Sequence, residues 1–297
     1  MINKKDKLII STIVIIIIFF ILYFGMIKDD SNTKDIIIPN GFKIIEKDIS
    51  KGLVIEDNTG NQFVWIPVNN KEITLSRKTF VDNITNVKNK EAIERIYYGE
   101  EVLNSVTRSY KDDKKNYVYD IDYFKESVKK YGGFYISRYE IGDKNSKDFR
   151  NEPTKGKIAS KKGLIPYNFI SRDEALSLSQ NIYYGIKSTL INSYAWDTTL
   201  EYISQYNKDY VLNKKNNINK KIMKTGESND VVNNIYDLSG NVAEWTTEYS
   251  SNASYEYQAH CVYRGEAFNS DDLNPSVRNY NDNIKNEFIG FRIILYF

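Results

Sequence analysis

The sequence contains an uncharged, strongly apolar run from Leu8 to Ile27. As an α-helix, a run of this length extends roughly 30 Å, the thickness of the hydrocarbon core of a bilayer. A cleaved signal peptide is the alternative, but its apolar part is usually about 7–15 residues long and precedes a cleavage site with small residues. No such site follows between Gly25 and Asp30. We therefore expect an uncleaved transmembrane helix at residues 8–27.

The charges on either side of this run predict how the chain is oriented. Lys4, Lys5 and Lys7 lie before it, whereas Lys28 is followed at once by two aspartates. Cytoplasmic flanks carry the excess of lysine and arginine, so residues 1–7 are expected inside and the rest of the chain outside. The expected location is a cytoplasmic membrane, crossed once, with the domain displayed on the cell surface.

The rest of the chain has no excess of either charge. Without the residues before the apolar run, the numbers of basic and acidic residues are equal. Nucleic-acid binding normally needs a basic excess or patch, so we expect no nucleic-acid partner. The only cysteine is Cys261, so no disulfide can form within the chain.

Composition and periodicity divide the part after the anchor. Residues 28–40 are polar and are expected to form a short stalk, and residues 41–297 have the length of one large domain. Apolar runs on both sides of the turn sequence Asp57–Gly60 predict a β-hairpin. Residues from about 69 to 123 are charged, asparagine-rich and weakly periodic, which indicates an insertion.

Three helices are predicted from start signals. Asp122 is expected to cap a short helix over 122–130. Ser171 and Glu174 have the spacing of a capping box at the start of the second helix. The third begins near Ser193 and places apolar residues on one face at helical spacing. Both later helices are expected to be amphipathic and structural.

Several short motifs follow one another along the domain, and the strongest is the glycine- and asparagine-containing block that ends in Glu244-Trp245. In chain order the motifs are Phe63-Val64-Trp65-Ile66-Pro67, GFYISRYE over 133–140, Ile165-Pro166-Tyr167-Asn168, Trp196, NIYDLSGNVAEWT over 234–246, Tyr263-Arg264-Gly265 and Gly290-Phe291-Arg292. With these motifs the chain resembles the formylglycine-generating-enzyme, or sulfatase-modifying-factor, superfamily. The resemblance implies an α+β, loop-rich fold of the C-type-lectin type. Ala243 and Glu266 depart from it, where the family usually has tryptophan and glycine.

The resemblance also implies a structural calcium site. The side chains of Asp237 and Glu244 and the backbone carbonyls of Gly240 and Val242 match a calcium site of the family. Calcium binds several carboxylate and carbonyl oxygens, and this turn offers both. The alternative is that Asp237 and Glu244 only cap or pair locally.

The redox chemistry of the family lacks its ligands in this sequence. Family oxidases bind copper through two cysteine thiolates between the Arg-Gly block and the terminal Gly-Phe-Arg. No cysteine lies between Gly265 and Gly290, Ser270 stands near the first expected position, and Cys261 precedes the block. The iron-dependent branch needs several histidines, and the chain has one, His260. We expect no copper or iron, and His260-Cys261 is interpreted as part of an ordinary strand.

These observations favour a non-catalytic module that binds an unknown protein or glycan through its loops. The segment between residues 269 and 286 is the candidate surface because it is rich in hydrogen-bonding and aromatic side chains. Its expected ligand-binding residues are Asn269, Asn274, Arg278, Asn279, Tyr280, Asn281 and Asn283. Two alternatives remain open: a formylglycine-generating-type oxidase or other metal-dependent enzyme with displaced ligands, and a structural part of an envelope complex.

Overall fold

The computed structural model describes residues 36–68, 72–75, 77–78, 80–81, 84–85, 97–98, 121–212, 215–216, 218–250 and 260–297. The expected transmembrane helix at 8–27 and most of the insertion at 69–123 lie outside these residues. Within the described residues, no helix is both long and apolar enough to span a bilayer. Residues 36–297 form one compact unit. It includes the end of the expected stalk, because Ile36 and Ile38 pack against the core.

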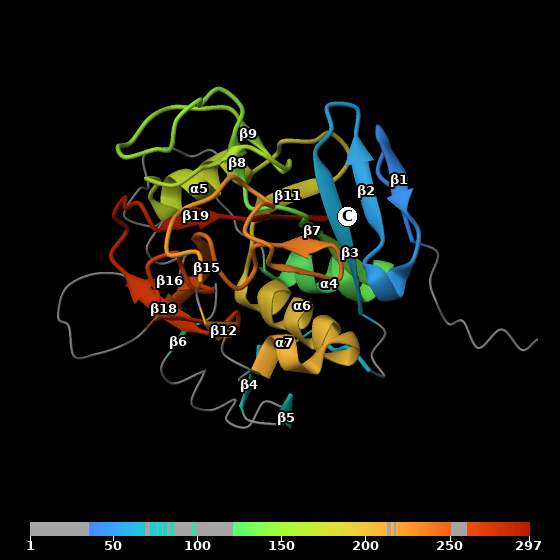
Figure 1. The fold of residues 1–297 in the computed structure, drawn as a ribbon. Coiled ribbons are helices and arrows are strands. Elements are labelled where there is room, and N and C mark those ends of the chain that lie inside the picture. The colour runs from blue at the N-terminus through green and yellow to red at the C-terminus, as the bar shows by residue number, and fades with distance from the viewer. Residues whose placement is uncertain are drawn as a thin grey trace, which may run out of the picture. The chain divides into compact units, whose positions relative to one another are not determined.

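The centre of this unit is a six-stranded antiparallel sheet (Figure 1). Its strands, in spatial order, are β1 (Phe42–Glu46), β2 (Val54–Asp57), β3 (Gln62–Pro67), β7 (Gly133–Ser137), β20 (Ile293–Tyr296) and β11 (Lys187–Leu190). The predicted hairpin is confirmed as β2 and β3. Its turn is held by the Asp57 carboxylate, which accepts hydrogen bonds from the backbone N–H groups of Thr59 and Asn61 at 2.8 Å each.

A second sheet follows the motif blocks. It contains β18 (Arg278–Asn281), β16 (His260–Arg264), β15 (Ala243–Ser250) and β19 (Ile289–Phe291), and β6 (Tyr97–Tyr98) also pairs with β15. β15 and β19 run parallel, whereas the other pairs are antiparallel. Only Arg292 separates β19 from β20, so the terminal Gly-Phe-Arg motif joins the two sheets.

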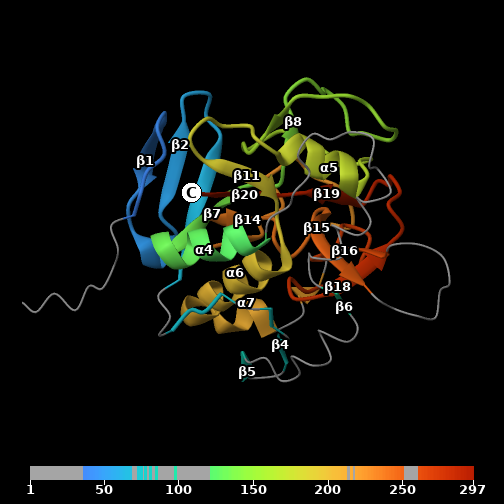
Figure 2. The same ribbon diagram turned by 180° about the vertical axis from the view of Figure 1, so that it is seen from behind.

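Both faces of the central strands of the six-stranded sheet, β3, β7 and β20, are buried. Alternate residues of its strands enter two separate cores, with Val64 and Ile136 in one and Phe63 and Tyr135 in the other. The first core also receives the helices α4 (Ile121–Tyr131), α6 (Ser193–Tyr206) and α7 (Lys208–Leu212), and the second receives α5 (Arg172–Ser179) and the second sheet. Figure 2 shows this layering from behind. Double burial explains why the sequences of these three central strands are almost continuously apolar.

Two of the three predicted helix starts are confirmed, whereas the first helix already begins at Ile121, so Asp122 lies in its first turn and is not its cap. The Ser171 hydroxyl accepts from the Glu174 N–H, and the Glu174 carboxylate accepts from the Ser171 N–H, so the capping box forms. The third helix begins at Ser193, and its Trp196, Leu200 and Ile203 are buried. The short elements that complete the unit are η1 (Ile49–Lys51), β4 (Phe80–Val81), β5 (Ile84–Thr85), β8 (Gly142–Asp143), β9 (Ile158–Ala159), β10 (Ile165–Pro166), β12 (Lys215–Asn216), β13 (Val231–Val232), β14 (Ile235–Tyr236) and β17 (Asp272–Leu273). The described part therefore mixes helix and strand and has more strand, which is compatible with the expected type of domain.

Candidate functional site

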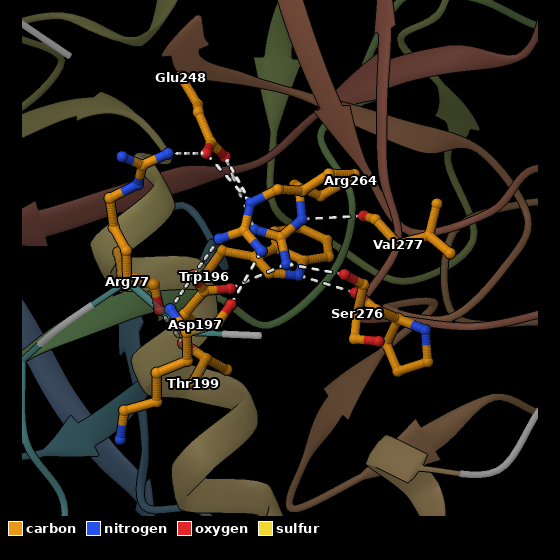
Figure 3. Close-up of polar contacts among 12 residues, drawn as sticks. Arg77, Trp196, Asp197, Thr199, Glu248, Arg264, Ser276 and Val277 are labelled. Carbon is orange, nitrogen blue, oxygen red and sulfur yellow. Dashed lines mark hydrogen bonds and ion pairs between the residues drawn. The ribbon is translucent and has the colours of Figure 1, made fainter. Parts of the chain in front are cut away.

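A buried ionic cluster supports the segment that sequence reasoning selected for recognition (Figure 3). Arg264 of β16 and Arg278 of β18 are directly opposite each other in the antiparallel pair. Two carboxylates lie with them: Asp197 from α6 is 2.8 Å from Arg264 Nη2, and Glu248 from β15 is 3.0 Å from Arg278 Nε. Arg77 also pairs with Glu248. These five residues, here called the arginine cluster, are all buried in side chain.

The arginine cluster contains three guanidiniums and two carboxylates. Burial opposes ionisation of Glu248, but the positive charges of Arg278, Arg77 and Arg264 hold the pKa of its carboxyl below the ordinary value. Burial and the charge of Arg278 lower the pKa of Arg264 to about 10. Glu248 is thus firmly anionic. The two carboxylates lie between arginines that would otherwise repel each other across the strand pair.

Two members of the family motifs also hold the backbone next to β18. Trp196 Nε1 donates to the carbonyl of Pro275 at 2.8 Å. Arg264 donates to the next two carbonyls, those of Ser276 at 3.1 Å and Val277 at 2.9 Å. Figure 3 shows these contacts converging on one stretch of chain. Three consecutive carbonyls therefore have buried donors, which fixes the path of the segment that leads into β18.

The structure separates the seven predicted ligand-binding residues into three groups. Arg278 lies in the arginine cluster, and the Asn274 side chain accepts from the N–H and hydroxyl of Ser276 at 2.9 and 2.8 Å, so both have structural roles. Asn269 and Asn283 are exposed. The remaining residues are the half-buried Asn279 and Asn281, and Tyr280, whose side chain lies outside the description.

Asn283 is tied to α5 at the start of that helix. Its amide donates to the Asp173 carboxylate at 2.7 Å, and its carbonyl oxygen accepts from the Asp173 N–H at 3.3 Å. Two residues further, Lys285 Nζ lies 2.6 Å from Glu174 Oε1. The end of the expected recognition segment is therefore positioned beside α5.

Sequence reasoning missed Arg77, Asp197 and Glu248. Asp197 follows the singled-out Trp196 in α6, and Glu248 continues the strand that begins at the Glu244-Trp245 motif. A charged residue within an apolar pattern was the available signal. The sequence could not predict that these residues pair, because Arg77 and Glu248 are 171 residues apart in the chain.

The side chains expected to bind calcium lie in a second buried polar region. Glu244 Oε1 accepts two hydrogen bonds from Arg292, at 2.8 Å from Nη2 and 3.2 Å from Nε. Glu244 Oε2 is buried and has no hydrogen-bond partner. The Asp237 carboxylate accepts from the Gly226 N–H and from the Ser228 hydroxyl.

Asp237, Glu244 and Glu140 are buried carboxyl groups that influence one another's ionisation. Burial raises the pKa of Asp237 to about 6 and that of Glu244 to about 8. Burial, followed by the charges of Asp237 and Glu244, raises the pKa of Glu140 well above its usual value. Among the described residues, no three side chains of His, Cys, Asp or Glu form a group that could hold a metal ion. A cation here would therefore depend on backbone carbonyls as well.

Among the described residues near the expected copper-binding positions of the family, no nucleophilic side chain is fully exposed. Cys261 is completely buried in β16, and burial raises the pKa of its thiol to about 11. The Ser270 hydroxyl donates to the Glu266 carboxylate at 2.8 Å. Asp271 and Asp272 are both exposed, and Asp271 pairs with Lys220, as expected of solvated acids.

Comparison with known proteins identifies one family. The family model described as "Sulfatase-modifying factor enzyme 1-like domain" matches residues 184–296. No curated protein and no solved structure matches the chain. The match includes the motif blocks from Trp196 to Arg292, so the resemblance predicted from them is confirmed. Within the unit, β20 of the matched range lies between β7 and β11, so strands before residue 184 complete the same sheet.

Proposed function

We propose that this chain, which carries a sulfatase-modifying factor enzyme 1-like domain at residues 184–296, is a membrane-anchored recognition module without the redox chemistry of its family. Residues 8–27 would anchor it in a cytoplasmic membrane and leave residues 36–297 outside. The domain would use a loop-rich, C-type-lectin-like scaffold to present the segment after Arg264-Gly265 to a protein or glycan.

The observation that carries this proposal is the absence of copper ligands from the segment in which family oxidases bind copper. It contains no cysteine between Gly265 and Gly290, and Ser270, near the first expected position, is engaged with Glu266. The one cysteine, Cys261, is buried in a strand with a raised pKa. Because Cu(I) needs soft, deprotonated thiolates, this arrangement supports loss of the copper chemistry.

The support beneath this segment favours a binding role. Buried donors from Trp196 and Arg264 fix its backbone, while Asn269 and Asn283 remain exposed. A binding surface gains affinity when its backbone is already ordered, since less conformational entropy is lost on binding. The same rigidity would serve a surface that reads a partner through exposed asparagine side chains.

We also propose a structural calcium ion held by the Asp237 and Glu244 side chains and the Gly240 and Val242 carbonyls. The buried Glu244 Oε2 without a partner and the raised pKa values of both carboxyls fit a cation at this position. Arg292 neutralises only one of the nearby carboxylates. A bound cation would stabilise the ionised forms and so the folded domain.

Metal analysis of the full chain in lipid nanodiscs tests the loss of redox chemistry. We expect calcium and no stoichiometric copper or iron, and no conversion of a cysteine-containing peptide to an aldehyde when Cu(I) is supplied. A tightly bound copper or iron atom, or aldehyde formation, would contradict the proposal.

Thermal melting tests the calcium ion. We expect calcium to raise the melting temperature over that measured in chelator, because a ligand that binds only the folded state stabilises it by mass action. Asp237→Asn should abolish this shift. The control Asp271→Asn, at an exposed acid, should retain it. An equal shift in both variants would argue against the assigned site.

A further inference from the structure

A cavity of about 480 Å³ opens between α5 and the loop at residues 153–156. Its walls are mainly apolar and include Pro153, Phe169, Ile170 and Leu178. This volume lies in the range of about 300–1,000 Å³ that is typical of sites for small ligands. None of these residues belongs to the arginine cluster or to the expected calcium site, and the cavity therefore needs its own explanation.

The cavity is preformed, because its floor is tied to the core. The buried Tyr167 hydroxyl accepts from the Gly156 N–H at 3.0 Å and donates to the Thr154 carbonyl at 3.3 Å, which holds the loop against the floor. The Ile170 carbonyl accepts from Trp245 Nε1 at 2.9 Å. The side facing α5 is fixed in turn by the capping box of that helix.

The charged groups at the cavity are two lysines and one glutamate. Glu174 pairs with Lys285 at 2.6 Å, and its other oxygen accepts from the Ser171 N–H and hydroxyl at 3.1 and 3.0 Å. Both oxygens of its carboxylate therefore have partners. Burial alone would raise the pKa of Glu174, but the hydrogen bond from Lys285 is the largest of the contacts that lower it below the ordinary value. Lys155 is exposed and forms no ion pair with a described carboxylate. One positive charge at the cavity thus remains unneutralised.

We propose that this cavity binds a carboxylate attached to a compact apolar group. The apolar walls would take the hydrophobic body, and Lys155, assisted by Lys285, would take the anionic end. This chemistry is shared by small aromatic or aliphatic acids and by a peptide chain that ends in a hydrophobic residue. The inference rests on the proposed recognition function and gives it a ligand class. It also locates the ligand beside the candidate recognition segment, because Lys285 and the neighbouring Asn283 belong to that segment.

Titration of the nanodisc-embedded full chain with four probes tests the inference. The probes are N-acetylphenylalanine, its primary amide, the peptide Gly-Ser-Gly-Ser-Phe with a free carboxyl terminus, and the same peptide amidated. We expect saturable binding of at least one free acid, with the matching amide weaker by up to about fivefold, as a single exposed charge contact predicts. Binding of the small acid alone identifies small acids as the source, and binding of the peptide acid identifies a chain terminus.

Two charge-reversal variants distinguish the site from general electrostatic attraction. Lys155→Glu should abolish the preference for acid over amide, whereas Lys147→Glu, at an exposed lysine outside the cavity, should retain it. Both side chains are exposed, so folding is preserved, and melting temperatures verify this. Equal affinity for acid and amide, equal effects of the two variants, or no binding of any probe would overturn the inference. None of these results bears on metal content or calcium stabilisation, which test the proposed function separately.

Discussion

The guanidinium of Arg264 and the carboxylate of Asp197 form a 2.8 Å ion pair between β16 and α6, and both side chains are completely inaccessible to solvent. The pair joins the Arg-Gly motif to the helix that carries Trp196. Such a pair is costly to bury, and it remains stable only when its other hydrogen-bonding groups also find partners. Here Asp197 also accepts from Arg278 and from the Lys78 N–H at 2.7 Å.

Charge balance within the arginine cluster predicts two different mutational outcomes. Asp197→Asn leaves three buried guanidiniums with one carboxylate and should lower the free energy of unfolding by about 3–5 kcal/mol. Arg77→Met leaves two guanidiniums with two carboxylates, so it should cost less than about 2 kcal/mol. Denaturant titration followed by tryptophan fluorescence measures both changes.

The control for this comparison is a surface ion pair. Lys43 lies 3.1 Å from Glu56, and its side chain is 71% exposed. Lys43→Ala should therefore change stability by no more than about 1 kcal/mol. If Arg77→Met destabilised the domain as much as Asp197→Asn, charge balance would not be the reason for the stability of the cluster.

Local signals in the sequence predicted the elements well. The Asp57 turn, the Ser171 capping box and the start of α6 at Ser193 each depend on contacts within four residues, and all three formed as expected. The pairing of Glu244 with Arg292 was not predicted, because the two residues are 48 positions apart and periodicity carries no long-range information.

The candidate surface was less predictable because its residues depend on distant segments. Arg278 was interpreted as a surface residue, since an arginine in a polar loop is usually solvated. It is buried because Asp197 and Glu248 arrive from α6 and β15. Likewise, the cavity beside α5 is built from segments at 153–156 and 167–178 that no pattern in the sequence connects.

Substitution of Gly265 tests whether the space beside Glu244 is needed for calcium binding. Its φ of +72° is unfavourable for other residues, and a Cβ atom there would lie 3.0 Å from the Leu238 carbonyl and 3.4 Å from Glu244 Oε2. Gly265→Ala should cost more than about 1 kcal/mol and reduce the stabilisation by calcium. Gly185 has φ +80° and open space around it, so Gly185→Ala should show only the backbone cost. Melting in calcium and in chelator compares them, and identical calcium shifts would separate Gly265 from the ion.

The raised pKa values of Asp237 and Glu244 predict how stability depends on pH without calcium. Their ordinary pKa values are 3.8 and 4.5, and those in the folded domain are about 6 and about 8. The folded state therefore binds more protons than the unfolded state between these values, so the free energy of unfolding should fall as pH rises from 5 to 8. Calcium should reduce this fall, because it stabilises the ionised carboxylates.

Melting temperatures at pH 5, 6.5 and 8, in chelator and in calcium, measure this dependence. Asp237→Asn should remove the part of the fall near pH 6 and only reduce the part at higher pH, to which Glu244 and Glu140 contribute. A melting temperature that rises from pH 5 to pH 8 in chelator would show that these carboxyls do not set the pH dependence.

The thiol of Cys261 should be unreactive in the folded protein. It is completely buried, and its pKa of about 11 leaves roughly one thousandth of it as thiolate at pH 8. Modification by a disulfide reagent at pH 8 should be at least about a hundredfold slower in the native chain than in denaturant. As the chain has one cysteine, the colour released reports this residue alone.

Ser270→Cys provides the matched comparison, because it places a thiol in a half-buried loop near the position of the first copper ligand of the family. This second thiol should react rapidly in the folded state while Cys261 stays protected, so one equivalent is released before denaturation and one after it. Rapid reaction of the unmodified chain would mean that β16 opens readily. In that case Cys261 could meet a metal or a substrate, and the argument from its burial against thiol chemistry would fail.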